Sequence, residues 1–303
     1  MRERQPTLVA AENQLARLLR NVSDSLTMPG VRALHEGGSN VSRTQEQLYL
    51  QARRWLDTLG KRPDALLPRR AQLVRELAFI LRNLELSGAL DMHQAMITEL
   101  IDTRPSLAAS MPDPINVVRT EALVYERSAD VLMHRHMQAV AGAVSDAVLT
   151  GLEAQETNAE IGARLYVMLK GQPNVVDGKK GLLRSWANTW AITEANRYNN
   201  LGRIEMAEEA GDYVWGYRYQ GTLDDHTCDE CAAYIDPPLE VSKEDCTDFT
   251  PFHFGCRTNM WPVMSSEITG RENRSDTDAL AEAGKGISEG FGGDPREALR
   301  EAA

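Results

Sequence analysis

The sequence has few cysteines, only four in 303 residues. So small a number excludes a disulfide-rich scaffold and is typical of a chain that folds in a reducing cytoplasm. The sequence also lacks any run of eighteen apolar residues, and its first residues have no apolar core of a signal peptide. We therefore expect neither a membrane-spanning helix nor a membrane as a partner.

The sequence also has fewer basic than acidic residues, with 33 Lys and Arg and 44 Asp and Glu, which gives a net charge of −11. This balance argues against a general nucleic-acid-binding protein. The charge is unevenly spread, because residues 1–82 hold 14 Lys and Arg and 8 Asp and Glu, which is +6 and leaves −17 for the remainder. A basic front on an acidic body predicts a docking surface for an acidic partner or for DNA phosphates. Arginines that merely line solvated helix faces give the same pattern.

Six arginines of this basic front are the candidate partner-binding residues. They are spread over at least two expected helices and the turn between them, which is too dispersed for a helix that reads base edges. If packaged DNA is a partner, we therefore expect phosphate contacts without sequence preference. The six are Arg53, Arg54, Arg62, Arg69, Arg70 and Arg75.

Hydrophobic residues make up 42% of the chain, so it is globular and long enough for two domains. Apolar residues at steps of three and four predict helices along most of it. The first is expected over residues 7–27 and would end at Pro29-Gly30. Another would end near Gly88, with a shorter helix after it. We interpret residues 1–110 as a helical docking region.

Residues 115–152 lack proline and predict a long central helix, which if unbroken would be roughly 57 Å long at 1.5 Å per residue. His134 and His136 lie two apart on it, so they point in different directions and do not form a metal-binding pair. We expect both histidines at or near the surface.

A later helix is expected over about residues 182–209. Gly202 lies inside it and costs about 1 kcal/mol relative to Ala, which indicates that another backbone passes close by. Glu194 can pair with Arg197, three residues on. We expect Glu194 and Asn200 to bind the backbone of the segment that follows, although a solvated polar face would show the same residues.

Aromatic residues alternate from Tyr213 to Tyr219 and predict a strand, and a second strand is plausible over residues 258–263. The predicted fold is mainly α with a small α+β C-terminal module: a helical N-terminal region, a long central helix and a small zinc-ribbon-like sheet. The helix and the module together would occupy residues 115–263. Residues 265–303 are rich in Ser, Glu, Asp, Ala and Gly and are expected to form a flexible acidic tail.

Two closely spaced pairs hold three of the four cysteines. Cys228 and Cys231 form a C-x-x-C turn, and His253 and Cys256 form an H-x-x-C turn. Two residues between ligands let one tight turn aim both side chains at one point, so two such turns supply the four ligands of a closed, structural zinc site. Such a site would help a weakly cored segment to fold.

Other interpretations of these cysteines stay open. The C-x-x-C pair could be a redox pair, the thiols could form disulfides outside a cell, or they could be plain buried thiols. Cys246 is left over; it could substitute for a ligand but is more simply an ordinary loop cysteine.

Around these pairs, over residues 150–262 at best, the chain resembles the head morphogenesis domain of tailed-phage minor head proteins. The resemblance implies a structural protein, not an enzyme, that accompanies the portal protein or the major capsid protein. It would lie in the virion, at the capsid interior or portal vertex, and in the host cytoplasm during assembly. Besides the four Cys and His residues, the motif positions are Thr193, Glu194, Asn200, Gly202, Arg203, Asp224, Asp225, Thr227 and Arg257.

An enzymatic function is the alternative. Asp224, Asp225 and His226 beside Cys228 could hold a divalent ion for phosphodiester hydrolysis, as in a metal-dependent nuclease or a toxin-like effector with the same C-terminal module. Adjacent residues in an extended strand point to opposite faces, however, so these side chains do not converge on one atom. No set of nucleophile, base and orienting group is visible.

Overall fold

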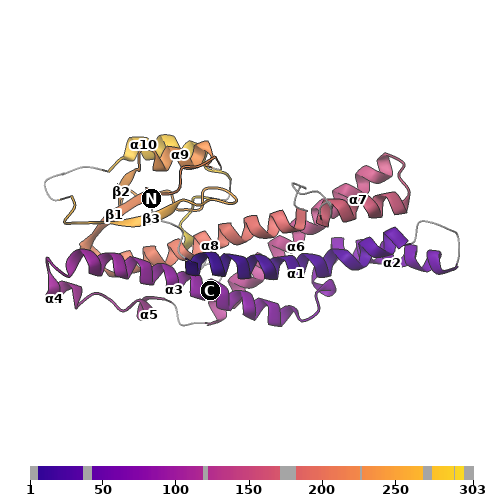
Figure 1. Ribbon diagram of the computed structural model, residues 1–303, viewed down its shortest axis with the longest axis horizontal. Coiled ribbons are helices and arrows are strands. Elements are labelled where there is room, and N and C mark those ends of the chain that lie inside the picture. The colour runs from indigo at the N-terminus through magenta and orange to yellow at the C-terminus, as the bar shows by residue number, and fades with distance from the viewer. Residues whose placement is uncertain are drawn as a thin grey trace. The chain divides into compact units, whose positions relative to one another are not determined.

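The computed structural model describes residues 6–36, 43–118, 122–170, 182–225, 227–268, 275–289 and 291–296. They form a mostly helical chain with one three-stranded antiparallel sheet near its C-terminal end, which confirms the predicted fold class (Figure 1). No helix among these residues is long and apolar enough to cross a membrane.

The chain divides into two compact units, and each is assembled from separate stretches of sequence. The helical unit comprises Asn13–Leu77 and Ala129–Thr189. The sheet unit comprises Met1–Glu12, Ala78–Ser128 and Trp190–Ala303. Residues 78–110, which the sequence analysis assigns to the helical docking region, therefore belong to the sheet unit.

The principal helices are α1 (Pro6–Glu36), α2 (Arg43–Lys61), α3 (Arg70–Leu100), α6 (Ala122–Glu153), α7 (Asn158–Lys170) and α8 (Leu182–Glu209). The sheet module that follows consists of β1 (Val214–Gln220), α9 (Asp229–Ile235), β2 (Glu240–Ser242), β3 (Asn259–Met264) and α10 (Thr277–Ala283). The short helical turns are η1 (Pro63–Leu66), α4 (Pro105–Ala108), α5 (Pro114–Val117), η2 (Gly211–Tyr213) and η3 (Gly284–Gly286).

The prediction that Pro29-Gly30 ends the first helix is wrong, because α1 continues through Pro29 to Glu36. A proline inside a helix removes one backbone donor and leaves carbonyl oxygens without their usual partners. Trp55 of α2 compensates nearby, since its Nε1 donates to the carbonyl oxygen of Leu26 at 2.6 Å. A Cβ at Gly30 would overlap the Trp55 ring, so this glycine serves a close contact and does not end the helix.

The predicted long central helix is present as α6, but it does not extend over all of residues 115–152. The long helix α6 begins at Ala122, and α5 precedes it as a single turn capped by Asp113, whose Oδ1 accepts from Ile115 N at 2.9 Å. Val118 then adopts an extended conformation, with φ −68° and ψ 133°, and is buried. Burial of Val118 in this conformation interrupts a segment that its apolar spacing alone would make helical.

His136 lies in the core of the helical unit, and the expectation of a surface position is wrong for it. Its Nε2 lies 2.7 Å from Ser23 Oγ and 3.2 Å from the carbonyl oxygen of Leu19, both on α1. Its side chain is fully buried, whereas His134 is exposed as expected. Burial lowers the pKa of His136 from its ordinary value to about 4, because the imidazolium would lose its hydration.

We expect His136 to make stability depend on pH between about 6.5 and 4. In this window the unfolded chain binds a proton on this histidine and the folded chain does not, so stability falls as the pH falls, by about 3 kcal/mol in all. Urea unfolding of His136→Gln and of the wild type, at pH 7 and at pH 5, measures the difference in slope. The exposed His134→Gln provides the matched control and should keep the wild-type slope; an equal slope in His136→Gln would contradict the assignment.

The sheet has the order β2-β1-β3, with β1 in the centre. Tyr217 of β1 is paired with Val241 of β2 and Pro262 of β3. On one face Tyr219 packs against Tyr234 of α9 and Phe252, with ring centroids 5.0 and 5.9 Å away. Figure 1 shows α9 and α10 on this face and the C-terminal half of α8 on the other.

Both edges of the sheet are covered by polar groups of the chain itself. Along β3, Asn200 Oδ1 accepts from Met260 N at 2.9 Å, Pro262 has no N–H, and Glu267 Oε1 accepts from Met264 N at 3.0 Å. Covered edges of this kind cannot pair with a strand of another molecule. The sheet is therefore closed to growth along β3.

The β2 edge is covered by the segment before α10. Asp276 exchanges two hydrogen bonds of 2.9 Å with the backbone of Glu240, and Leu280 and Ala283 of α10 are buried. The expected flexible tail thus contains residues with defined contacts, although the division of the chain at residues 110, 115 and 265 remains a prediction.

Two glycines let α3 and α8 approach closely within the sheet unit. A Cβ at Gly202 of α8 would overlap the carbonyl oxygen of Glu85, and a Cβ at Gly88 of α3 would overlap that of Asn199. This confirms the predicted role of Gly202. It also corrects the prediction that a helix ends near Gly88, because α3 runs through this glycine to Leu100.

Candidate metal centre

The first pair of candidate ligands lies at the start of α9. Cys228 is the N-cap residue of this helix, with an extended backbone, and its Sγ accepts from Cys231 N at 3.4 Å. Cys231 follows within the first turn and is buried. The helix start therefore turns both thiols of the C-x-x-C motif toward the same side.

The second pair is formed by a tight turn before β3. Cys256 N donates to the carbonyl oxygen of His253 at 3.2 Å, which closes the turn. Gly255 within it has φ +78°, a left-handed conformation that favours glycine. This turn brings His253 and Cys256 to the start of α9.

The two turns converge as the sequence predicts. His253 Nε2 lies 3.0 Å from Cys228 Sγ and 3.0 Å from Cys231 Sγ, and the ligand atoms of these three residues all lie within 4.8 Å of one another. Cys256 Sγ lies 3.7 Å from Cys231 Sγ. A group of two thiols and an imidazole at these distances could hold a metal ion.

The imidazole of His253 is oriented for this task. Its Nδ1 lies 2.8 Å from the carbonyl oxygen of Phe254, which can only accept, so Nδ1 carries the proton and donates. Nε2 is then the unprotonated nitrogen, and its lone pair faces the two thiols. A backbone carbonyl that fixes the tautomer of a ligand histidine is a common outer-shell arrangement at metal sites.

The buried thiols differ in acidity. The hydrogen bond from Cys256 lowers the pKa of Cys231, and the same bond together with burial raises the pKa of Cys256. Burial also raises the pKa of Cys228. A cation would favour the thiolate form of all three, because metals bind thiolates and release their protons.

A stripe of polar residues on α8 holds the second turn in place. Gly255 N donates to Thr193 Oγ1 at 2.8 Å, and Asn196 Nδ2 donates to the carbonyl oxygens of Cys256 and Thr258 at 3.2 and 2.8 Å. Asn200 continues the stripe by accepting from β3, which confirms the backbone contact expected of it. The residues are spaced by three and four, so they share one helical face.

Asn196 is the member of this stripe that the sequence analysis missed. Its spacing of three residues from Thr193 and four from Asn200 places it on the same helical face, and this spacing could have identified it. Glu194, in contrast, pairs with Arg197 at 3.5 Å, as its separation predicts. No hydrogen bond from Glu194 to the turn before β3 is found among the described residues.

We expect Asn200→Ala to destabilise the sheet unit by about 2 kcal/mol. The substitution leaves Met260 N without an acceptor in a buried position and also removes the bonds of Asn200 to Asn196. Asn188→Ala on the same helix is the matched control, because it makes the same gain in helix propensity and Asn188 has no side-chain hydrogen bond within the described part of the chain. Equal urea midpoints for the two variants would contradict the assigned role of Asn200.

An ion pair joins the two ligand turns from outside. Arg257 binds Asp224 through both guanidinium nitrogens, at 2.8 and 2.6 Å. Thr227 closes the Asp224 turn, since its Oγ1 accepts from Asp224 N at 3.0 Å and donates to the carbonyl oxygen of Thr222. The motif residues Asp224, Thr227 and Arg257 thus connect the two turns, and Asp225 is exposed. His226 lies outside the described residues.

Arg203 ties the stripe to α3 and β3. It binds Asp91 of α3 and Asn259 of β3 at 3.2 and 3.1 Å, and its guanidinium lies 4.4 Å from the centre of the Trp261 ring. Almost all of its surface is buried. Arg203 is therefore a structural link between the helices and the sheet.

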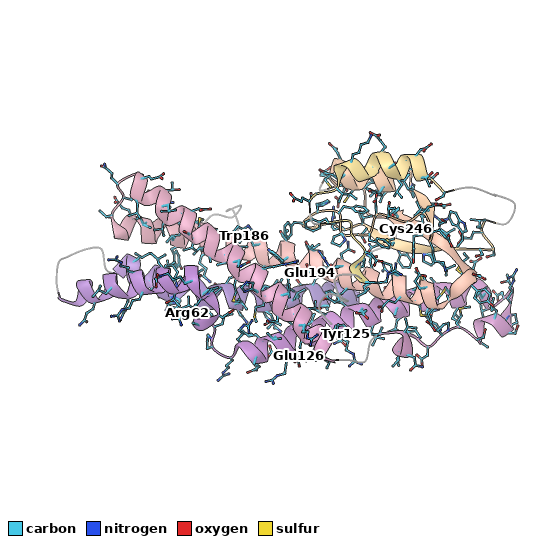
Figure 2. The ribbon with its side chains drawn as sticks, turned by 180° about the vertical axis from the view of Figure 1, so that it is seen from behind. Arg62, Tyr125, Glu126, Trp186, Glu194 and Cys246 are labelled. Carbon is cyan, nitrogen blue, oxygen red and sulfur yellow. The ribbon has the colours of Figure 1, made fainter. Side chains whose placement is uncertain are left out.

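Cys246 lies apart from the candidate ligands. Its sulfur is 3.7 Å from Tyr219 Oη and 3.8 Å from the carbonyl oxygen of Asp248. Cys246 is labelled in Figure 2. Burial raises its pKa to about 12, so it remains a thiol. This is the ordinary loop cysteine that the sequence suggests.

The six candidate partner-binding arginines all belong to the helical unit. Arg70 is engaged with Asp64 and Asp130, at 3.3 and 2.5 Å. The other five, of which Arg62 is labelled in Figure 2, are exposed and have no ion pair among the described residues: Arg53, Arg54, Arg62, Arg69 and Arg75.

Comparison with known families supports the resemblance seen in the sequence. Residues 138–261 match the profile of the family described as Phage Mu protein F like protein, a family of head morphogenesis and minor capsid proteins. The matched segment includes the second half of α6, all of α7, α8, β1, α9 and β2, and the first half of β3. No curated protein and no solved structure matches the chain.

Proposed function

We propose that this chain is a structural minor head protein of a tailed phage. It docks on the portal or on the inner capsid and acts in head assembly, genome packaging or ejection. The match of residues 138–261 to a family of phage head proteins is the observation that carries this proposal. The alternative nuclease function draws no support from Asp224, whose carboxylate is bound by Arg257.

The metal centre in this proposal is a structural zinc site with three thiolates and one imidazole. Zinc bonds of about 2.3 Å to sulfur in a tetrahedral site place two sulfurs about 3.8 Å apart. The observed separation of 3.7 Å between Cys231 and Cys256 fits this value. The other two corners would be occupied by Cys228 and His253, whose ligand atoms already contact each other.

The exposed arginines of the helical unit are the proposed docking residues. An acidic surface of the portal or capsid protein is the favoured partner, because the chain as a whole is acidic and would repel DNA. Binding to packaged DNA would instead show no sequence preference. The logarithm of its binding constant would fall with the logarithm of the salt concentration, with a slope of about −0.9 per neutralised phosphate.

Association with the portal tests the proposal. Full-length tagged chain is co-expressed with the portal protein, and the affinity of the recovered pair is measured for wild type, Arg62→Glu and Arg135→Glu. Both substitutions reverse one exposed charge in the same unit, but only Arg62 belongs to the proposed docking residues. We expect Arg62→Glu to weaken association about tenfold and Arg135→Glu to change it little.

Two results would overturn the proposal. One is the absence of portal and capsid association by the full-length chain. The other is metal-dependent hydrolysis of DNA that disappears in Asp225→Ala, which would favour the nuclease function. Titration of short duplexes of unrelated sequence at two salt concentrations separates protein docking from DNA binding at the arginines.

A further inference from the structure

A groove within the sheet unit is not used by the metal centre. Its volume is about 530 Å³, within the range of about 300–1,000 Å³ that ligand pockets occupy. It is lined by residues from the last turns of α3, from strands β1 and β3 and from the end of α9. The side chains that define its chemistry are Glu99, Arg218, Ile235, Trp261, Pro262 and Glu267.

The floor of the groove offers an aromatic surface. Trp261 lies opposite Arg218 in the register of β1 and β3 and is only partly buried. Its ring already accepts one guanidinium, that of Arg203, at 4.4 Å from the centroid. Ile235 and Pro262 extend the apolar surface beside it. The floor is thus suited to apolar groups and to flat cations.

The walls of the groove are acidic. Arg218 is neutralised by Glu240, through its Nε at 2.6 Å, and also by Glu267 at 3.2 Å. Glu99, on α3, is exposed and has no ion-pair partner among the described residues. Two carboxylates, those of Glu99 and Glu267, therefore line the groove together with one guanidinium, that of Arg218. The surrounding unit is acidic as well, with 16 Lys and Arg against 32 Asp and Glu, a net charge of −16.

We infer that this groove binds a short arginine-containing segment of a partner protein. A guanidinium of that segment pairs with Glu99, and an apolar neighbour covers Ile235 and Pro262. The carboxylates exclude a phosphate backbone, and the volume exceeds what a single side chain fills. Since both sheet edges are covered, the segment lies on the face and does not add a strand. The inference is independent of the proposed portal docking, which rests on other residues.

Fluorescence anisotropy with a labelled hexapeptide of two arginines, two leucines and two glycines tests this inference on the full-length chain. We expect binding that weakens with salt, because the contact is largely electrostatic. A peptide with lysines in place of the arginines should bind several-fold more weakly, since lysine lacks the planar group that stacks on an indole. A peptide with glutamates should not bind.

Two variants locate the contact. Glu99→Lys should weaken binding of the arginine peptide about tenfold, whereas Glu244→Lys, an equal charge change at an exposed residue outside the groove, should leave it nearly unchanged. The inference is overturned if no peptide binds, if the two variants lose affinity equally, or if argininamide displaces the peptide at equal molar concentration. If the wild-type chain associates with the portal and any of these results is found, this inference is overturned and the proposed function is unaffected.

Discussion

Cys231→Ser should lose its bound zinc, and the sheet module should unfold under conditions in which the wild type is stable. Cys231 is the thiol at the centre of the cluster, since its Sγ contacts both His253 Nε2 and Cys256 Sγ. Apparent binding free energies of structural zinc in small domains are about 10–16 kcal/mol, which is comparable to the whole stability of an ordinary domain. A module with one three-stranded sheet and the short helices α9 and α10 has little other stabilisation to replace the metal.

Cys246→Ser is the matched control for this prediction, because Cys246 lies in the same module but outside the cluster. Zinc content is measured by elemental analysis of protein purified without chelator, and unfolding is followed by circular dichroism in urea. A chelator should lower the wild-type midpoint to that of Cys231→Ser and leave the variant unaffected. Equal zinc content in the two serine variants would contradict the ligand assignment.

Gly202→Ala should destabilise the sheet unit by about 3 kcal/mol. The added Cβ would overlap the Glu85 carbonyl oxygen and lie 2.8 Å from Ala89 N, and both atoms belong to the backbone of α3. A backbone cannot yield as the end of a flexible side chain can, so α3 and α8 would have to separate and give up the bond between Arg203 and Asp91.

Gly142→Ala supplies the control for this substitution. Gly142 also lies inside a long helix, α6, but a Cβ there would meet nothing within 4 Å. Alanine in this position should raise stability by about 0.5–1 kcal/mol, because glycine is the poorer helix former. Relative to the wild type, we therefore expect the urea midpoint to fall in Gly202→Ala and to rise in Gly142→Ala. A stabilising effect of Gly202→Ala would mean that the two helices do not approach as described.

The candidate site was largely predictable because its signals are local in sequence. The spacing of Cys228 with Cys231 and of His253 with Cys256 indicates two turns, and any fold that joins them completes a cluster. Gly202 was informative for the same reason, since a glycine inside a helix is costly unless something lies against it. Asn196 was missed, although it lies on the same helical face as Thr193 and Asn200.

The errors concern features that depend on distant partners. Pro29 and Gly88 are local signals for a helix end, yet both helices continue because Trp55 and the Asn199 backbone pack against those positions. His136 is polar, and its contacts with Ser23 and Leu19 of α1 help to make its burial tolerable. Periodicity reports the preferences of one segment, so it could not show these contacts between segments far apart in the chain.

X-ray absorption at the zinc edge of the purified full-length chain tests the central claim most directly, since it reads the ligands of the metal. The account predicts one zinc per chain, with three sulfurs at about 2.3 Å and one nitrogen at about 2.0 Å. It also predicts that Cys256→Ser would reduce the sulfur count, while Cys246→Ser would leave it at three. A chain without zinc, or a zinc shell made mainly of oxygen and nitrogen, would contradict the account.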